Sequence, residues 1–397
     1  MTATTRAATE PTPDAVAPPP GHRRFPLFDG LRAIAVTLVV VFHTPGIIDI
    51  GWEPLVRVLV HLNVGVTVFF LVSGFLLYRP FVAHRAGGPA APGAAVFYKR
   101  RFLRIFPAYW VCLVVLLIVP DAISLSTPNL LAQFGLVHTL PFVGEGNCVQ
   151  QGANCYLSHT WSLAVEVTFY AALPLYVIAA NRLARGRETL SWARRELVLL
   201  AALSAATLFY TYWVNYGTET SLARGTLIGY FDWFALGMGA AVVSVVTERH
   251  RTRLTSWIGR NPGVLWLGSA ALYLALVAYL PITPYFTTRS DYVLANLGFG
   301  AVSLLLILPA AFDGGRGAPR KFLANGVVAW IGLVSYGVFL WHLAVMIRLD
   351  REFESMAYLP MLVIGFAISV AIAAASYYVI ERPILRFKTR PLLTRHR

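Results

Sequence analysis

Long runs of apolar residues, separated by short polar segments, make up most of this chain. Ten runs have about the 20 residues that a helix needs to cross the hydrocarbon core of a bilayer. They are approximately 33–50, 58–78, 105–124, 161–180, 197–214, 228–246, 263–281, 293–312, 328–348 and 358–380. The pattern predicts an all-α integral membrane protein with about ten transmembrane helices.

The distribution of basic residues predicts the orientation of these helices. If the N-terminus is inside, the segments facing the cytoplasm carry 28 of the 33 Lys and Arg residues, and the outer segments carry 5. Cytoplasmic loops of membrane proteins carry such an excess. We therefore expect both termini in the cytoplasm of a multi-pass protein of the cell membrane. The same asymmetry explains the net charge of +14, so no nucleic-acid partner is expected.

The two ends of the chain differ in composition from the apolar region. Residues 1–24 are rich in Ala, Thr and Pro and lack the apolar segment of a signal peptide, so a disordered cytoplasmic tail is expected. Residues 386–397 form a second, basic tail. No soluble catalytic domain is predicted at either end, so any chemistry takes place in the bilayer or at its faces.

The longest outer loop, from about 125 to 160, contains two of the three cysteines. Cys148 and Cys155 either form a disulfide, which persists outside the cytoplasm, or remain free thiols. Their spacing does not indicate zinc, because no second pair of ligands is nearby. Cys112 lies in an apolar run and is interpreted as a small core residue.

Arg32 and His43 lie in the first apolar run, in FDGLRAIAVTLVVVFH. Eleven residues of helix come within about 20° of three full turns and rise about 16 Å, so the two side chains share one face. Ionisable side chains at membrane depth are costly and are functional candidates by default. A neutral imidazole can take a proton near pH 7, which makes His43 a candidate general base. The alternative is a structural bond from His43 to a backbone carbonyl.

Three other ionisable residues lie in the outer halves of apolar runs. Glu166, in HTWSLAVEVTFY, either orients His43 or an acceptor hydroxyl, or bonds structurally to another helix. His342, in SYGVFLWHLAV, either faces the same cavity as His43 or lies at the membrane interface. Asp232, in YFDWFALGMG, is equally compatible with a water-facing boundary position.

Basic and small residues near the cytoplasmic side suggest a binding region. Arg101 and Arg104 are three residues apart and share a helix face, at the membrane level of Arg32. Together the three can hold a phosphorylated ligand. Ser73 and Gly74 are explained either by close helix packing, which is the commoner cause, or by a slot for a thin acyl chain.

Six segments resemble the membrane-bound acyltransferase 3 family: FDGLRAIAVTLVVVFH, FFLVSGFLLYRPF, RRFLRIFPAYW, TWSLAVEVTFY, SYGVFLWHLAV and SYYVIERPILRF. They occur in the family's order and extend over about 25–385. The resemblance implies a ten-helix integral enzyme that takes an acyl group from cytoplasmic acyl-coenzyme A. The implied acceptor is a hydroxyl of a glycan, a lipid-linked sugar or a secondary metabolite.

The family's motifs fall on particular residues of this chain. Its Arg-x10-His motif corresponds to Arg32 and His43, and its Arg-x-x-Arg motif corresponds to Arg101 and Arg104, which implies contacts with coenzyme A. Glu166 matches the acidic position of its TWSL motif. Some relatives carry an additional extracytoplasmic hydrolase-like domain. None is found here, which favours direct transfer within one polypeptide.

Two matches lie late in the chain. His342 matches the family's LWH motif, and Asp232 with Gly237 resembles a weaker motif. An Arg that often precedes that Asp is missing here, so Asp232 is the least certain of the implied residues.

Together these observations predict a mechanism. Arg32, Arg101 and Arg104 hold the diphosphate of acyl-coenzyme A, and Ser73 lies along the donor path. His43 then deprotonates an acceptor hydroxyl; an acyl-histidine intermediate is the alternative. Two further catalytic residues are expected. Glu166 orients or charge-stabilises the imidazole of His43, and His342 helps to line the acceptor side.

Other classes of function are favoured less. A transporter or flippase for an acylated or anionic solute can also place charges in the membrane, but the helices lack paired Gly/Pro breaks. A non-catalytic partner in glycan export is the third possibility. No metal is expected, because no ligand constellation occurs. The sequence does not identify the acyl group, the acceptor or the oligomeric state, although a homo-oligomer is compatible with it.

Overall fold

A computed structural model of the chain describes residues 21, 23–44, 50–119, 127–140, 155–213, 226–250, 252–282, 288–312, 317–353 and 356–389. Within these ranges every regular element is a helix. The ten long ones are α1 (Leu27–His43), α3 (Val64–Arg85), α4 (Ala94–Ile118), α7 (Trp161–Ala184), α8 (Thr189–Trp213), α10 (Phe231–Arg249), α12 (Pro262–Tyr279), α13 (Arg289–Ala311), α15 (Gly326–Glu352) and α16 (Tyr358–Ser376).

Shorter helices connect the long ones. They are α2 (Glu53–Leu59), α5 (Thr127–Phe134), η2 (Ser158–Thr160), η3 (Leu227–Gly229), α11 (Arg253–Arg260), α14 (Ala318–Leu323), η4 (Tyr377–Glu381), α17 (Arg382–Leu385) and η5 (Arg386–Thr389). The segment η4 is a π-helical turn that joins α16 to α17.

Nine of the described helical segments are long and apolar enough to cross a membrane. The fold class predicted from the sequence, an all-α integral membrane protein, is thereby confirmed. The orientation of the termini stays a prediction. Most of both expected tails, residues 1–20 and 390–397, lies outside the described residues.

Helix α1, the long helix that is not among these nine segments, differs from the predicted span over 33–50. It begins at Leu27 and ends at His43, and its 17 residues rise about 26 Å. The polar residues Asp29 and Arg32 lie before the predicted span. In the structure both belong to the helix, because α1 is surrounded by protein and its first turns need not face lipid.

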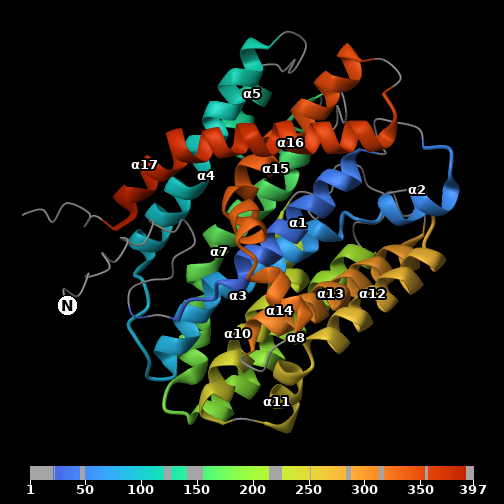
Figure 1. The fold of residues 1–397 in the computed structure, drawn as a ribbon. Helices are drawn as coiled ribbons and strands as arrows, with labels where there is room; N and C mark the ends of the chain where they lie inside the picture. Colours follow the sequence, from blue (N-terminus) through green and yellow to red (C-terminus); the bar gives the residue numbers. More distant parts are fainter. Residues whose placement is uncertain are drawn as a thin grey trace, which may run out of the picture.

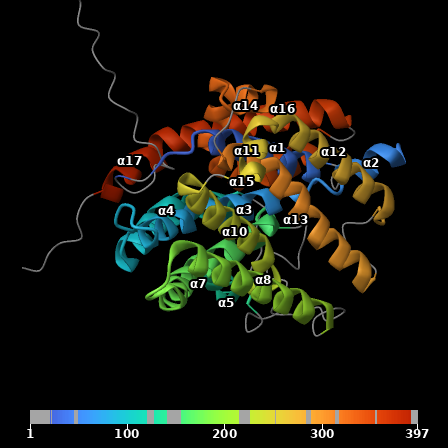
Figure 2. The same cartoon turned by 90° about the horizontal axis from the view of Figure 1, so that it is seen from below.

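Helix α1 lies with α3 and α15 in the middle of the helical bundle (Figures 1 and 2). Its residues Leu31, Ala35 and Val39, at helical spacing, are almost completely buried. Helix α10 packs along α3, α12 along α13, and α16 along α15. In Figure 1 α16 crosses α15 at a wide angle. The central position of α1 means that any group on it is surrounded by other helices.

Glycines allow the central helices to approach closely. A Cβ on Gly74 of α3 would lie 2.3 Å from the carbonyl oxygen of Phe234, and a Cβ on Gly237 of α10 would lie 2.1 Å from that of Leu71. A Cβ on Gly332 of α15 would lie 1.8 Å from the carbonyl oxygen of Asp29 in α1. These distances are too short for any side chain. Close helix packing therefore explains Gly74, as the sequence favoured.

The cysteines take two different forms. Cys112 is free and buried in α4. Cys155 is disulfide-bonded. Cys148, the partner that the sequence suggests for it, lies outside the described residues.

Candidate functional site

A cavity of about 190 Å³ opens between α1, α3, α4, α7 and α15. Five residues singled out in the sequence line it: Arg32, Ser73, Arg101, Arg104 and Glu166. They come from four helices, so only the packing of the bundle brings them together. The cavity is thus the place where the predicted donor-binding residues meet.

The three predicted binding arginines differ in how far protein groups neutralise them. Arg104 pairs with Glu381, with 2.6 Å between Nη1 and Oε2, and both side chains are buried. The guanidinium of Arg101 lies over the ring of Tyr170, 5.8 Å from its centre. In the described part of the chain, no carboxylate forms an ion pair with half-buried Arg32. Arg32 and Arg101 therefore line the cavity without an ion pair from a described carboxylate, and their role in binding an anionic ligand stays a prediction.

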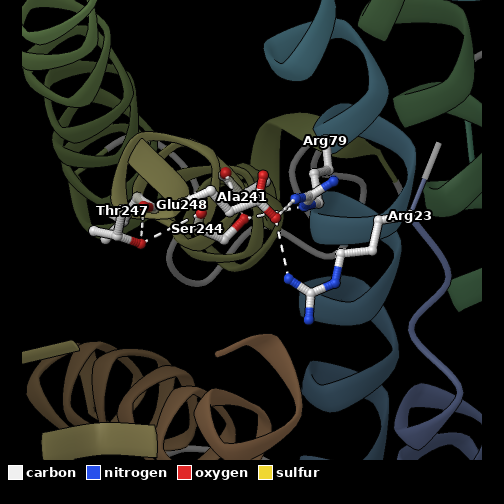
Figure 3. A network of polar contacts seen from close by, with 7 residues as sticks. Arg23, Arg79, Ala241, Ser244, Thr247 and Glu248 are labelled. Carbon is white, nitrogen blue, oxygen red and sulfur yellow. Dashed lines mark hydrogen bonds and ion pairs between the residues drawn. The ribbon is translucent and has the colours of Figure 1, made fainter. Parts of the chain in front are cut away.

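A second set of polar groups lies where residues 23–26 border the cavity (Figure 3). Arg79 of α3 and Arg23 both pair with Glu248 of α10, at 2.5 and 3.1 Å. The Nε of Arg79 also donates to Ser244, at 3.2 Å. Both guanidinium groups lie over the ring of Phe25, at 4.7 and 5.1 Å from its centre. These contacts attach the segment before α1 to α3 and α10.

Glu166 lies in the cavity, where Ser73 donates a hydrogen bond to its Oε1. The sequence hypothesis had Glu166 orient His43. In the structure the described hydrogen-bond partners of the His43 ring are a backbone carbonyl and another histidine. Glu166 is not among them. The reason is rotational: α7 presents Glu166 toward α3 and the cavity. A role for Glu166 at the donor stays a prediction.

His43 and His342 form a direct pair at the other end of α1. The Nε2 of His342 lies 3.1 Å from the Nδ1 of His43. The Nδ1 of His43 is 2.8 Å from the Val39 carbonyl oxygen, and the Nδ1 of His342 is 2.7 Å from that of Phe339. His342 is completely buried and His43 is half-buried. The prediction that both face one place is compatible with this contact.

The hydrogen-bond partners determine which nitrogens carry protons. A carbonyl oxygen only accepts, so each Nδ1 beside one carries the hydrogen. The Nε2 of His342 is then a lone pair, and it shares the single Nδ1–H of His43 with the Val39 carbonyl oxygen. The Nε2 of His43 is also a lone pair, and it is the nitrogen left available as a base.

His159 joins this pair, and the sequence interpretation missed it. Its ring centre lies 4.8 Å from that of His342 and 6.2 Å from that of His43. The available signal was its position two residues before the Trp of the HTWSL segment, one turn ahead of a membrane helix. We refer to His43, His159 and His342 as the histidine cluster.

The remaining candidate, Asp232, lies apart from the cavity and the histidine cluster. It is buried in the first turn of α10. Its neighbour Trp233 donates to the backbone carbonyl of Asn296 in α13, at 3.0 Å. Asp232 is not among the residues that line the cavity. Of the residues that the structure describes, no three His, Cys, Asp or Glu are arranged to hold a metal ion.

Comparison with known families agrees with this arrangement of motifs. The model of the acyltransferase 3 family, described as an acyltransferase domain, matches residues 26–378. This chain belongs to the acyltransferase 3 family. The match includes α1 to α16, and therefore both the cavity and the histidine cluster. As a member of this family with nine candidate spans, the chain is a multi-pass membrane protein.

Three named relatives are similar over most of this chain. A putative peptidoglycan O-acetyltransferase, YrhL of Bacillus subtilis, is 26% identical and covers 91% of the chain and 55% of its own length. The peptidoglycan O-acetyltransferase OatA of Listeria monocytogenes is 24% identical over 90% of the chain and 55% of its own length. A putative membrane-bound transacylase, BcsY of Komagataeibacter xylinus, is 27% identical over 95% of the chain and 87% of its own.

The chain spans about half the length of the first two of these relatives. No solved structure matches it.

Proposed function

We propose that this protein is a membrane O-acyltransferase that moves an acyl group from acyl-coenzyme A to a hydroxyl of a glycan or of a small molecule. The observation that carries the proposal is the pairing of an arginine-lined cavity with a buried histidine pair, joined by the single helix α1. Membership of the acyltransferase 3 family supports the class of reaction.

The donor is proposed to enter the cavity from the cytoplasmic side. Arg32 and Arg101 bind its diphosphate, because guanidinium groups match phosphate oxygens in geometry and charge. Ser73 and Glu166 lie on the wall that the pantetheine arm passes. From Arg32 to His43 the helix rises about 16 Å, a depth that an extended pantetheine arm can span.

The transfer step follows from the assignment of protons in the histidine pair. The Nε2 of His43 takes the proton of the acceptor hydroxyl as its oxygen attacks the acyl carbonyl carbon. A carbon–oxygen bond forms and the carbon–sulfur bond breaks. The proton then passes from His43 to the sulfur of coenzyme A. The Val39 carbonyl and His342 hold the imidazolium that forms between these two transfers.

The acceptor is proposed to be a glycan of the cell envelope, acylated on a hydroxyl. This part of the proposal is drawn from the relatives, two of which are named as peptidoglycan O-acetyltransferases. The end of α1 that carries His43 is the predicted outer end, where such a polymer is accessible.

The test uses full-length protein in lipid nanodiscs with radiolabelled acetyl-coenzyme A and fragments of peptidoglycan. We expect label in the glycan, equimolar release of coenzyme A, and a loss of at least about 10³-fold in His43→Ala. His250→Ala, which removes an exposed histidine, is the matched control and keeps wild-type activity. Full transfer by His43→Ala contradicts the mechanism. Movement of an acylated solute without release of coenzyme A supports a transporter instead.

A further inference from the structure

His159 takes no part in the proposed transfer step, although it packs against the histidine pair. Its ring packs edge-to-face against Phe339, with 4.9 Å between the ring centres, and against His342 at 4.8 Å. Only 3% of the residue is exposed. It belongs to the short helix η2, directly before α7.

Neither ring nitrogen of His159 has a described partner at full hydrogen-bond geometry, and the backbone of Phe339 is the polar group that interacts with the ring. A neutral imidazole carries one N–H donor and one acceptor nitrogen, and buried polar groups of this kind are nearly always satisfied. The other two rings of the histidine cluster obey that rule through the carbonyls of Val39 and Phe339. Among the described residues, no protein group therefore takes the His159 donor at full hydrogen-bond geometry, and a group that is not part of the chain can accept from it.

His159 lies between a residue that lines the cavity, Phe339, and the histidine pair. Phe339 lines the cavity, and its ring also packs against His159. Ser162, which also lines the cavity, donates to the backbone carbonyl of His159 at 3.3 Å. His159 and His43 do not themselves line the cavity, and Phe339 and Ser162 are the lining residues that contact His159.

We propose that the ring N–H of His159 donates a hydrogen bond to the oxygen of the reacting acyl carbonyl. This inference rests on the proposed acyl transfer. As the hydroxyl oxygen attacks and the carbon–sulfur bond breaks, negative charge develops on the carbonyl oxygen. The proton of the hydroxyl goes to His43 and then to sulfur, while His159 keeps its own proton and stabilises that oxygen.

A neutral donor suits this place better than a second base. His159 and His342 lie less than 5 Å apart, and His43 is the next ring along. Two imidazolium ions at this distance in a buried site would repel each other. A neutral N–H, already oriented and shielded from water, stabilises a developing oxyanion without gaining charge itself.

The test compares His159→Phe, which keeps an aromatic ring but removes the donor, with His159→Gln, which restores a donor amide. Removing one such donor costs about 10²- to 10³-fold in rate. We expect that loss in the single-turnover rate of His159→Phe, with the affinity for acetyl-coenzyme A changed by less than about 2-fold. His159→Gln is expected to recover at least about 10-fold of the rate.

A spectroscopic measurement separates the proposed role from a structural one. Acetyl-coenzyme A labelled with ¹³C at the carbonyl is bound to His43→Ala, which does not turn over, and its carbonyl stretch is recorded by isotope-edited infrared spectroscopy. We expect a lower stretching frequency in His43→Ala than in the double variant that also carries His159→Phe. Equal frequencies, with the donor bound in both, would overturn the inference.

Controls distinguish the ways in which the experiment can fail. His61→Phe replaces another buried histidine, one that bonds the Arg57 carbonyl away from the cluster, and keeps the wild-type rate. Each variant is checked as a monodisperse peak in detergent. If His159→Phe transfers normally while His43→Ala is inactive, only the role of His159 is wrong. If His43→Ala is also active, the proposed function itself is wrong.

Discussion

The two ends of α1 hold their functional groups in different ways. Around the cavity, charged side chains are held mainly by other side chains, as in the pairs Arg104–Glu381 and Ser73–Glu166. At the other end, the rings of His43 and His342 are held by backbone carbonyls of their own helices and by each other. A carbonyl inside a helix does not move, whereas a charged side chain adapts to its partner.

This difference matches the tasks proposed for the two ends. Binding the flexible, anionic part of a donor tolerates small displacements, because charge attracts over several ångströms. Proton transfer requires the base within about 3 Å of the reacting hydroxyl, so it depends on fixed geometry. Substitutions at the histidine end should therefore lower kcat, and substitutions at the cavity end should raise KM for the donor.

After His43→Ala and His159→Phe, the largest effect is expected from His342→Phe. The substitution keeps an aromatic ring but removes the nitrogen that accepts from His43, so the imidazolium formed in the reaction loses one of its two partners. We expect kcat to fall by about 10- to 100-fold, with KM for acetyl-coenzyme A unchanged. Steady-state kinetics measure both, and His342→Gln, which restores an acceptor, should regain part of the rate. A raised KM with normal kcat would contradict the distinction between the two ends.

A smaller effect of the opposite kind is expected from Arg32→Gln. Loss of a guanidinium that has no ion pair in the described part of the chain removes a charge-assisted contact with phosphate. We expect about 10-fold weaker donor binding, or about 1.4 kcal/mol, with kcat little changed. Direct titration with acetyl-coenzyme A at two salt concentrations measures it.

Arg104→Gln is the comparison for Arg32→Gln, because Arg104 is already paired. It leaves Glu381 buried without its cation, so thermal stability should fall together with affinity. Equal melting temperatures of Arg104→Gln and Arg32→Gln would show that the ion pair with Glu381 does not stabilise the fold.

The smallest effect concerns pH and the loop beside the histidine cluster. His138 is fully buried, 3.3 Å from the hydroxyl of Thr160, and burial lowers its pKa to about 4 from an ordinary value of 6.5. Below pH 6.5 the unfolded chain binds a proton that the folded protein does not. The stability that the neutral ring provides is complete above that pH and is lost as the pH falls toward 4.

At pH 6 the free energy of unfolding is lower by about 0.8 kcal/mol for this reason. Thermal unfolding of the purified protein at pH 6 and pH 8 measures it. His138→Gln, which cannot be protonated there, should show a smaller difference between the two pH values. An identical difference in both proteins would mean that His138 does not contribute.

Much of the fold follows from the sequence because bilayer thickness limits helix length. Ten apolar runs correspond to the ten long helices, although α1 begins at Leu27 instead of 33 and α4 at Ala94 instead of 105. The helix period also placed Arg32 and His43 on one element. What the sequence could not supply is the rotation of each helix about its axis. That rotation directs Glu166 toward Ser73 and brings Glu381 to Arg104.

The histidine cluster illustrates the same limit. His43 and His342 are 299 positions apart, and the sequence left open whether they share a cavity or His342 lies at the membrane interface. His159 lies outside the span expected at 161–180, so the sequence did not predict that its side chain is buried. The short helix η2, which places it against Phe339, depends on contacts that no local pattern encodes.

The sequence by itself determined the class of protein, the approximate spans and the candidate residues on each, because hydrophobic length and helical period are local properties. Only the tertiary structure decided which of these residues meet. Close approach of Gly332 to the carbonyl of Asp29 brings α15 against α1, and that contact allows His342 to reach His43. The physical reason is that distances between helices depend on side-chain shape across the whole interface, which involves residues hundreds of positions apart.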